Sequence, residues 1–150
     1  MEAVQAKLAA WLRTGSPGPD ERQRRELAIQ KVEQDYQLSL PEDFRLYLLH
    51  ASPTDQAWDD EMVIWWPIER LRNIPDEYDH PIAEPRIASQ ASDWLFFADF
   101  SLWCWAWAIC CGDGEDRGAI GLIGGSPDRV VADSFSEFAD RHLSDPNSLC

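Results

Sequence analysis

The stretch from Trp94 to Cys111 constrains the fold of this chain more than any other feature, because it is almost wholly apolar. Its length approaches the roughly 20 residues that a membrane-spanning helix needs. Asp99 and Ser101 interrupt the apolar run. Asp93 and Asp113 flank it, where a spanning helix carries positive residues on its cytoplasmic side. The stretch therefore fits the interior of a folded domain better than a bilayer.

Bulky and small side chains alternate in the second half of this stretch. Trp103, Trp105, Trp107 and Ile109 alternate with Cys104, Ala106, Ala108 and Cys110. A period of two places the bulky residues on one face of a β-strand. We therefore predict strands from Leu95 to Phe100 and from Leu102 to Ile109. Trp105 and at least one of Trp103 and Trp107 are expected in the core, and an exposed aromatic platform for a ligand is the alternative.

Amphipathic helices are predicted at both ends of the chain. The first ends in the turn-rich run from Thr14 to Pro19. Its apolar stripe comprises Val4, Leu8, Trp11 and Leu12. A second helix is capped by Asp20, a third opens with the capping box Ser39 to Glu42, and the last opens with Ser134 to Glu137. The stripe of the second helix comprises Ile29, Val32 and Tyr36.

Short strands fill the middle of the sequence. They are predicted from Met62 to Trp66, from Ala119 to Ile123 and from Val130 to Ala132. A short helix is predicted from Ile68 to Asn73. The proline-rich segment that follows it and runs to Ile87 is expected to be an exposed loop.

Helices at both ends around consecutive antiparallel strands predict an α+β fold. We expect a curved antiparallel β-sheet with the N- and C-terminal helices packed on one face. No repeat or boundary divides the sequence, so residues 1–150 are expected to form one domain. Within it, residues 1–19 form a helix and a turn-rich linker ahead of the core.

The charge of the chain restricts its partners. It has 13 Lys and Arg against 27 Asp and Glu, a formal net charge of −14. Such a chain repels nucleic-acid phosphates and anionic membranes, so neither is an expected partner. A basic protein is the natural complement, although the acidity alternatively serves only to keep a chain with 8 Trp soluble.

The sequence contains no recognisable motif for a metal or cofactor. His50, His80 and His142 are far apart in the sequence, and the four cysteines lack metal-type spacing. The glycines from Gly121 to Gly125 precede a Ser-Pro turn instead of a helix, so they do not form a phosphate-binding loop. With no signal peptide visible, reduced thiols in a cytoplasmic protein are expected. No cofactor, metal or catalytic residue is predicted, although acid-base catalysis by a carboxylate pair stays open.

Three local patterns, in this order, resemble the Smi/Knr-type branch of the SUKH superfamily. The first is Leu40-Pro41-Glu42-Asp43-Phe44 with Tyr47-Leu48, preceded by Ile29, Glu33 and Leu38. The second is Trp66-Pro67-Ile68-Glu69 with Leu71 and Asn73. The third runs from Phe97-Ala98-Asp99 through the strand Trp105 to Ile109 to Asp133-Ser134-Phe135-Ser136-Glu137-Phe138. The sequence departs from the family pattern at Ser101 with the tryptophan-rich strand after it, and at Ala51-Ser52-Pro53.

The resemblance implies a fold and a function. Bacterial members of the superfamily mostly act as immunity proteins, which bind and neutralise toxins delivered between bacteria. The resemblance supplies no catalytic residue and predicts a non-enzymatic protein with a cognate, basic toxin domain as its partner. A scaffold or regulatory interaction module of the same fold is the alternative, and a small enzyme is a third reading.

Acidic residues on the predicted loops are the candidate partner surface. Exposed carboxylates can steer a basic partner toward such a surface. The candidates are Asp55, Asp59, Asp60, Glu61, Asp76, Glu77 and Asp79, with Asp113, Glu115 and Asp116 as a further contact. The sequence leaves the identity of the toxin and the oligomeric state open.

Overall fold

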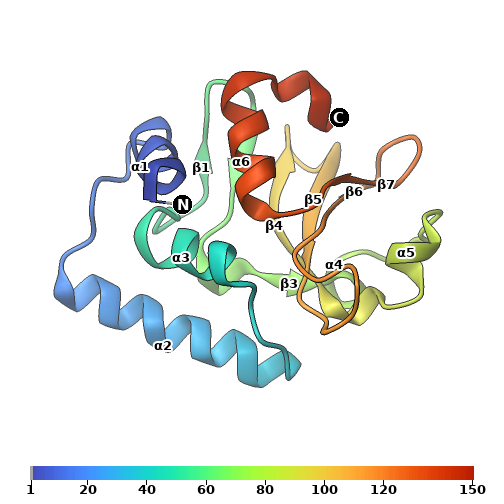
Figure 1. The fold of residues 1–150 in the computed structure, drawn as a ribbon, viewed down its shortest axis with the longest axis horizontal. Coiled ribbons are helices and arrows are strands. Elements are labelled where there is room, and N and C mark those ends of the chain that lie inside the picture. The colour runs from blue at the N-terminus through green and yellow to red at the C-terminus, as the bar shows by residue number, and fades with distance from the viewer. Residues whose placement is uncertain (1) are drawn as a thin grey trace.

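A computed structural model describes residues 2–150 and has an antiparallel sheet of seven strands at its centre (Figure 1). The strands are β1 (Ala57–Trp58), β2 (Val63–Trp65), β3 (Arg72–Asn73), β4 (Trp94–Phe100), β5 (Trp105–Cys110), β6 (Ile120–Ile123) and β7 (Arg129–Ala132). The α-helices are α1 (Glu2–Trp11), α2 (Pro19–Tyr36), α3 (Glu42–His50), α4 (Ile74–Glu77), α5 (Pro85–Ala88) and α6 (Phe135–Ser144). Three 3-10 helices are η1 (Ile68–Arg70), η2 (Ala91–Asp93) and η3 (Pro146–Leu149). The predicted α+β fold with an antiparallel sheet is confirmed.

The sheet follows the chain closely. Its order is β1-β2-β4-β5-β6-β7, and β3 pairs with β4 outside this path. β2 and β3 pair with successive parts of β4, at Ala98 to Phe100 and at Leu95 to Phe96 respectively. The pairing of β4 with β5 shifts register between Phe96 and Ala98, an irregularity that bends the strand locally.

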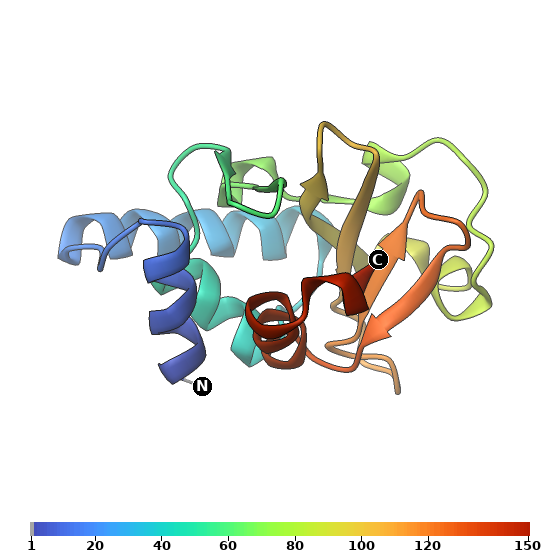
Figure 2. The same cartoon turned by 90° about the horizontal axis from the view of Figure 1, so that it is seen from above.

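The main core lies between one face of the sheet and helices α1, α2, α3 and α6. Trp65 and Phe97 from the sheet meet Phe44 of α3 and Phe138 of α6 in this core. Trp107 is also buried there, with 3% of its surface exposed, as its strand pattern predicted. Seen from above, α1, α2 and α3 lie to the left of β5, β6 and β7 (Figure 2).

The second face of the sheet is covered as well. Ile74 and Ile87 are buried there against Trp66 and Trp94, and the segment around α5 lies on the opposite side from α1 to α3 in Figure 2. The expectation of an exposed loop up to Ile87 therefore holds for the middle of the segment, such as Asp79 to Pro81, and is wrong for Ile74 and Ile87, which are buried at its two ends. The physical reason is that β2 and β4 carry apolar side chains on both faces, so both faces need cover.

A glycine lets α5 approach the sheet. A Cβ atom on Gly121 of β6 would lie 2.7 Å from Cδ1 of Ile87. Such a contact is shorter than packed side chains tolerate, so the small residue sets the distance between α5 and β6.

Helix ends were predicted with mixed success. Ser134 caps α6 as expected, since its side chain accepts a hydrogen bond from the Glu137 N–H at 3.0 Å. Asp20 lies inside α2, whose N-cap is Gly18, and α3 is preceded by Pro41 with no side-chain cap from Ser39. The side chain of Val4 lies outside the described residues. Among the helices described, none combines the length and apolar character needed to span a bilayer.

Candidate functional site

The structure brings two of the three predicted acidic segments to the same end of the sheet. The turn between β4 and β5 lies between them. On one side, the Ser101 N–H donates to the Met62 carbonyl at 3.0 Å. On the other side, the Trp103 indole donates to Glu77 Oε2 at 3.0 Å, and its ring stacks on Tyr78 with centroids 5.5 Å apart. The loop that carries Asp60 and Glu61 and the segment after α4 thus adjoin one turn.

The third acidic segment lies elsewhere. Asp113, Glu115 and Asp116 follow the opposite end of β5, a strand of six residues that spans about 20 Å at the usual rise. Asp113 and Glu115 are exposed. Asp116 is paired with Arg86 at 2.6 Å and keeps 17% of its side chain exposed. The structure therefore does not bring this segment together with the other two.

Asp59 does not lie on the surface, which corrects its assignment as an exposed loop charge. Its side chain is 0% exposed, although its backbone is partly exposed. Oδ1 accepts hydrogen bonds from the backbone N–H groups of Glu61 at 2.8 Å and Val63 at 3.1 Å. Oδ2 contacts the indole N–H of Trp11 at 3.0 Å, that of Trp65 at 2.8 Å and His142 Nε2 at 2.8 Å.

These contacts keep the Asp59 carboxylate ionised. Burial alone would raise its pKa, but hydrogen bonds from His142, Trp65 and Trp11 outweigh burial and lower the pKa to about 2. Asp59 is therefore a structural group that fixes the turn before β2 and ties α1, β2 and α6 together.

Two further carboxylates hold the neighbouring segments in the same way. Asp99, 4% exposed, accepts from the Trp66 indole at 2.7 Å and from the backbone N–H of Trp103 at 2.8 Å. Glu77 makes two hydrogen bonds with Arg70, at 2.7 and 2.8 Å. Burial opposes ionisation of Glu77, but Arg70 outweighs it and lowers the Glu77 pKa. With 13% of its side chain exposed, Glu77 already has an internal partner.

The β4–β5 turn has an unusual backbone. Ser101, Leu102 and Trp103 have positive φ angles of 46°, 61° and 65°, and Met62 across from them has a φ of 67°. This conformation is unfavourable for residues with a Cβ atom. The prediction that the strand begins at Leu102 is therefore wrong, because these residues reverse the chain and β5 begins at Trp105. Leu102 is left 77% exposed and Met62 49% exposed.

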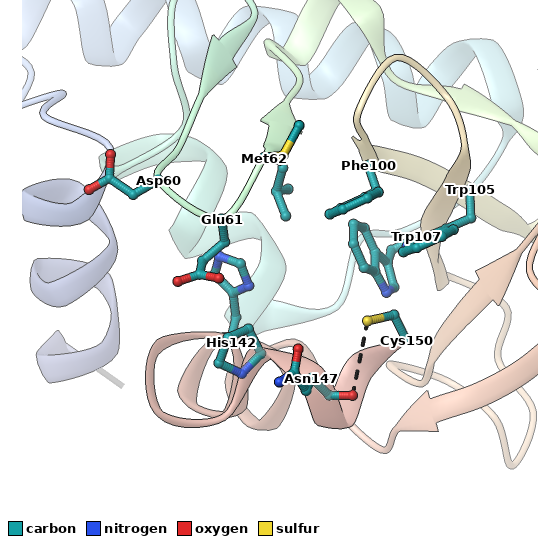
Figure 3. Close-up of a pocket in the computed structure, with 11 residues that line it drawn as sticks. Asp60, Glu61, Met62, Phe100, Trp105, Trp107, His142, Asn147 and Cys150 are labelled. Carbon is teal, nitrogen blue, oxygen red and sulfur yellow. Dashed lines mark hydrogen bonds between the residues drawn. The ribbon is translucent and has the colours of Figure 1, made fainter.

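A cavity of about 460 Å³ opens beside these turns (Figure 3). Its lining combines residues of the β1–β2 turn, β2, β4, β5, α6 and η3 with the residue after η3: Asp60, Glu61, Met62, Val63, Phe100, Trp105, Trp107, His142, Pro146, Asn147 and Cys150. Phe100, Trp105 and Trp107 lie together on the right of Figure 3, and His142 and Asn147 lie across from them. Glu61 and Met62 lie at its edge.

Trp105 is part of the cavity wall. It is half-buried and stacks on Phe100, with centroids 4.4 Å apart and planes 2° from parallel. Its expected place in the core is therefore only partly confirmed. Trp105 packs against the main core and also lines the cavity, so its ring is not fully enclosed.

The other predicted site residues remain at the surface. Asp60 keeps 72% of its side chain exposed and lies 4.0 Å from Arg13. Glu61 and Asp79 are exposed at the two sides of the β4–β5 turn, and Asp55 is exposed before β1. Asp76 is exposed but accepts a hydrogen bond from the Tyr36 hydroxyl at 2.8 Å.

Sequence reasoning missed the apolar part of this site. We define the hairpin-tip surface as Asp60, Glu61, Met62 and Leu102 together with the cavity beside them. His142 and Asn147 reach this cavity from α6 and η3, about 80 residues after Met62 along the chain. The only local signal was a methionine next to two acidic residues, and that signal does not indicate a cavity.

The chemistry of the surface suits binding. Acidic side chains with no buried partner border large apolar side chains, which is the composition of a protein-recognition site with a polar rim. Within residues 2–150, no three His, Cys, Asp or Glu side chains are grouped to hold a metal ion.

Comparison with known proteins supports the resemblance seen in the sequence. No curated protein matches the chain. A family model described as the SMI1 / KNR4 family (SUKH-1) matches residues 25–141, a range that begins inside α2, ends inside α6 and includes every described strand. Because this range is well over half of the 150 residues, the chain belongs to the SMI1 / KNR4 family (SUKH-1).

Proposed function

We propose that this protein is a non-enzymatic immunity protein that binds a cognate, basic toxin domain through the hairpin-tip surface and thereby neutralises it. One observation carries the proposal: exposed carboxylates border exposed apolar side chains on two adjoining, conformationally unfavourable turns. Residues with unfavourable backbone conformations cluster at functional sites, so they motivate a functional hypothesis here. Membership of the SUKH-1 family and the net charge of −14 support the same proposal.

The exposed acids suit recognition of a basic partner. Asp60 and the nearby Arg13 are both more than 70% exposed and 4.0 Å apart, a pairing that contributes little to folding. Such carboxylates stay available to an incoming Lys or Arg. Their main effect is to accelerate encounter, so binding through them slows as salt increases.

Charge reversal at the two ends of the sheet tests the proposal. The double variant Asp60→Lys with Glu61→Lys changes the hairpin-tip surface. The matched control, Asp113→Lys with Glu115→Lys, makes the same change in charge at the far end of β5. The protein is co-expressed with the toxin domain encoded beside its gene, and rescue from growth arrest is measured. Association rates are measured at two salt concentrations.

We expect the hairpin-tip variant to lose rescue and most of the salt dependence of association, while the control rescues like the wild type. Both variants should fold, because isolated surface charges usually change stability by less than about 0.5 kcal/mol. Equal effects of the two variants would refute the surface assignment. If the wild-type protein neutralises no such toxin, the immunity proposal fails and a scaffold role gains support.

A further inference from the structure

The cavity of the hairpin-tip surface differs from an ordinary surface depression in its walls. Phe100 and Trp105 stack face to face on one wall, and Trp107 lies beside them. Its volume of about 460 Å³ falls within the range of about 300 to 1,000 Å³ that is typical of ligand sites. The cavity can therefore hold a large apolar side chain against an aromatic wall.

The fold does not require large apolar residues at the positions of Leu102 and Met62. Each has a positive φ, where Asn or Gly would be more favourable, and each exposes about half or more of its surface. Neither belongs to a buried cluster of the described residues. Both residues thus combine an unfavourable φ angle with exposed apolar surface. Large apolar side chains in such positions are suited to contacts with another molecule.

The charge around the cavity restricts what that molecule is. Glu61 lies at the cavity edge in Figure 3, and Asp60 also lines it. A second copy of this chain would bring two such edges together within a pair of molecules of net charge −14 each. An anionic membrane would be repelled for the same reason. The complementary partner is a basic protein segment.

We propose that the cavity receives one aromatic or long aliphatic side chain of the partner, and that Lys or Arg flanks this residue in the partner's sequence. This inference rests on the proposed function. The apolar side chain stacks on the Phe100 and Trp105 wall. Met62, which lines the cavity, packs beside it, and Leu102 on the adjoining turn extends the apolar contact outside the cavity. The flanking cations pair with Asp60 and Glu61, so that the site recognises a basic segment with an apolar centre.

Short peptides test this proposal on the full chain without the toxin. The probe is an acetylated, amidated peptide of sequence Arg-Lys-Trp-Lys-Arg, added to isotope-labelled protein and followed by NMR. One control peptide replaces the Trp by Ala, and another replaces the four cations by Glu. We expect the probe to shift the amide signals of Met62, Leu102 and Asn147. The Ala peptide should bind about thirtyfold more weakly, the loss of a single anchor residue, and the Glu peptide should not bind.

Two protein variants locate the peptide. Asn147→Trp fills the cavity from an exposed position of η3, and Gln34→Trp adds the same group to an exposed position of α2 as its control. Leu102→Asn removes the apolar contact while supplying a residue that accepts positive φ, and Leu27→Asn removes another exposed leucine, on α2, as its control. We expect about thirtyfold weaker binding of the probe by Asn147→Trp and Leu102→Asn, and unchanged binding by both controls.

The outcomes separate this inference from the proposed function. Equal binding of the Trp and Ala peptides, or full binding by Asn147→Trp, overturns the inference. Toxin neutralisation that Asn147→Trp and Leu102→Asn leave intact also overturns it, while the immunity function stands. If the wild-type protein neutralises no toxin but binds the probe with the expected pattern, the immunity proposal fails and the apolar recognition site stands.

Discussion

Replacement of Asp59 by Asn tests the structural role of the buried carboxylate, with the neighbouring Asp60 as an internal control. Asn offers one acceptor oxygen where Asp offers two, so it cannot accept from the backbone N–H groups and from both indoles at once. In the best arrangement, the amide oxygen serves the backbone and the indole N–H groups of Trp11 and Trp65 lose their acceptor.

The expected loss in the free energy of unfolding follows from the two indole N–H groups that lose their acceptor. Two unpaired N–H groups at about 1 to 3 kcal/mol each give a range of about 2 to 6 kcal/mol. Trp11 is half-buried and can turn toward water, so we expect the lower part, about 2 to 4 kcal/mol. The pKa of Asp59 reflects the same hydrogen bonds: its fall from 3.8 to about 2 corresponds to about 2 kcal/mol at neutral pH, which lies within this range.

Urea unfolding at pH 7 measures the effect. Asp59→Asn should be destabilised by about 2 to 4 kcal/mol, whereas Asp60→Asn should stay within about 0.5 kcal/mol of the wild type. The Asp59 pKa is lowered in the folded state, so its contribution is complete above the ordinary pKa and disappears as pH falls. The difference between the wild type and Asp59→Asn should therefore shrink from about pH 4 to pH 2. Equal stability of the two Asn variants would refute the assigned role.

Two further predictions concern the core. Truncation of Trp107 to Ala removes a side chain that is 3% exposed and donates a hydrogen bond to the Leu149 carbonyl, so unfolding in urea should show a loss of about 3 to 5 kcal/mol. Thiol titration of the native protein should modify Cys104 and Cys150, which are exposed. Cys110 and Cys111 should react only after unfolding, because burial shields both thiols and raises their pKa.

The sequence predicted those parts of the fold in which periodicity and packing agree. Strand β4 was anticipated because its apolar run had to be buried, and helix α6 was anticipated from the capping box that begins at Ser134. The alternation of large and small residues also continued back to Trp103, where the backbone turns with positive φ angles and no glycine. Side-chain alternation does not report backbone reversal, so the start of β5 was placed too early.

The candidate site was harder to predict, because its parts depend on long-range contacts. Asp59 and Asp60 are adjacent in the sequence and chemically identical, yet one is buried and the other is exposed. Only the arrival of Trp11, Trp65 and His142 around Asp59 distinguishes them. Acidic composition indicated the kind of partner, but tertiary packing decides which carboxylates can meet it.

Asp59 and Asp99 hold the two turns through backbone contacts, and this affects which residues of the surface can be replaced. Asp59 binds the backbone N–H groups of Glu61 and Val63, and Asp99 binds that of Trp103. Support through the main chain requires no packing partner for the side chains between these anchors, and the positive φ angles of Met62 and Leu102 disfavour chiefly β-branched replacements there. New residues can therefore arise at positions 61, 62 and 102 while the turns keep their shape, so a lineage could change its binding preference by substitution at the hairpin tip without rebuilding its interior.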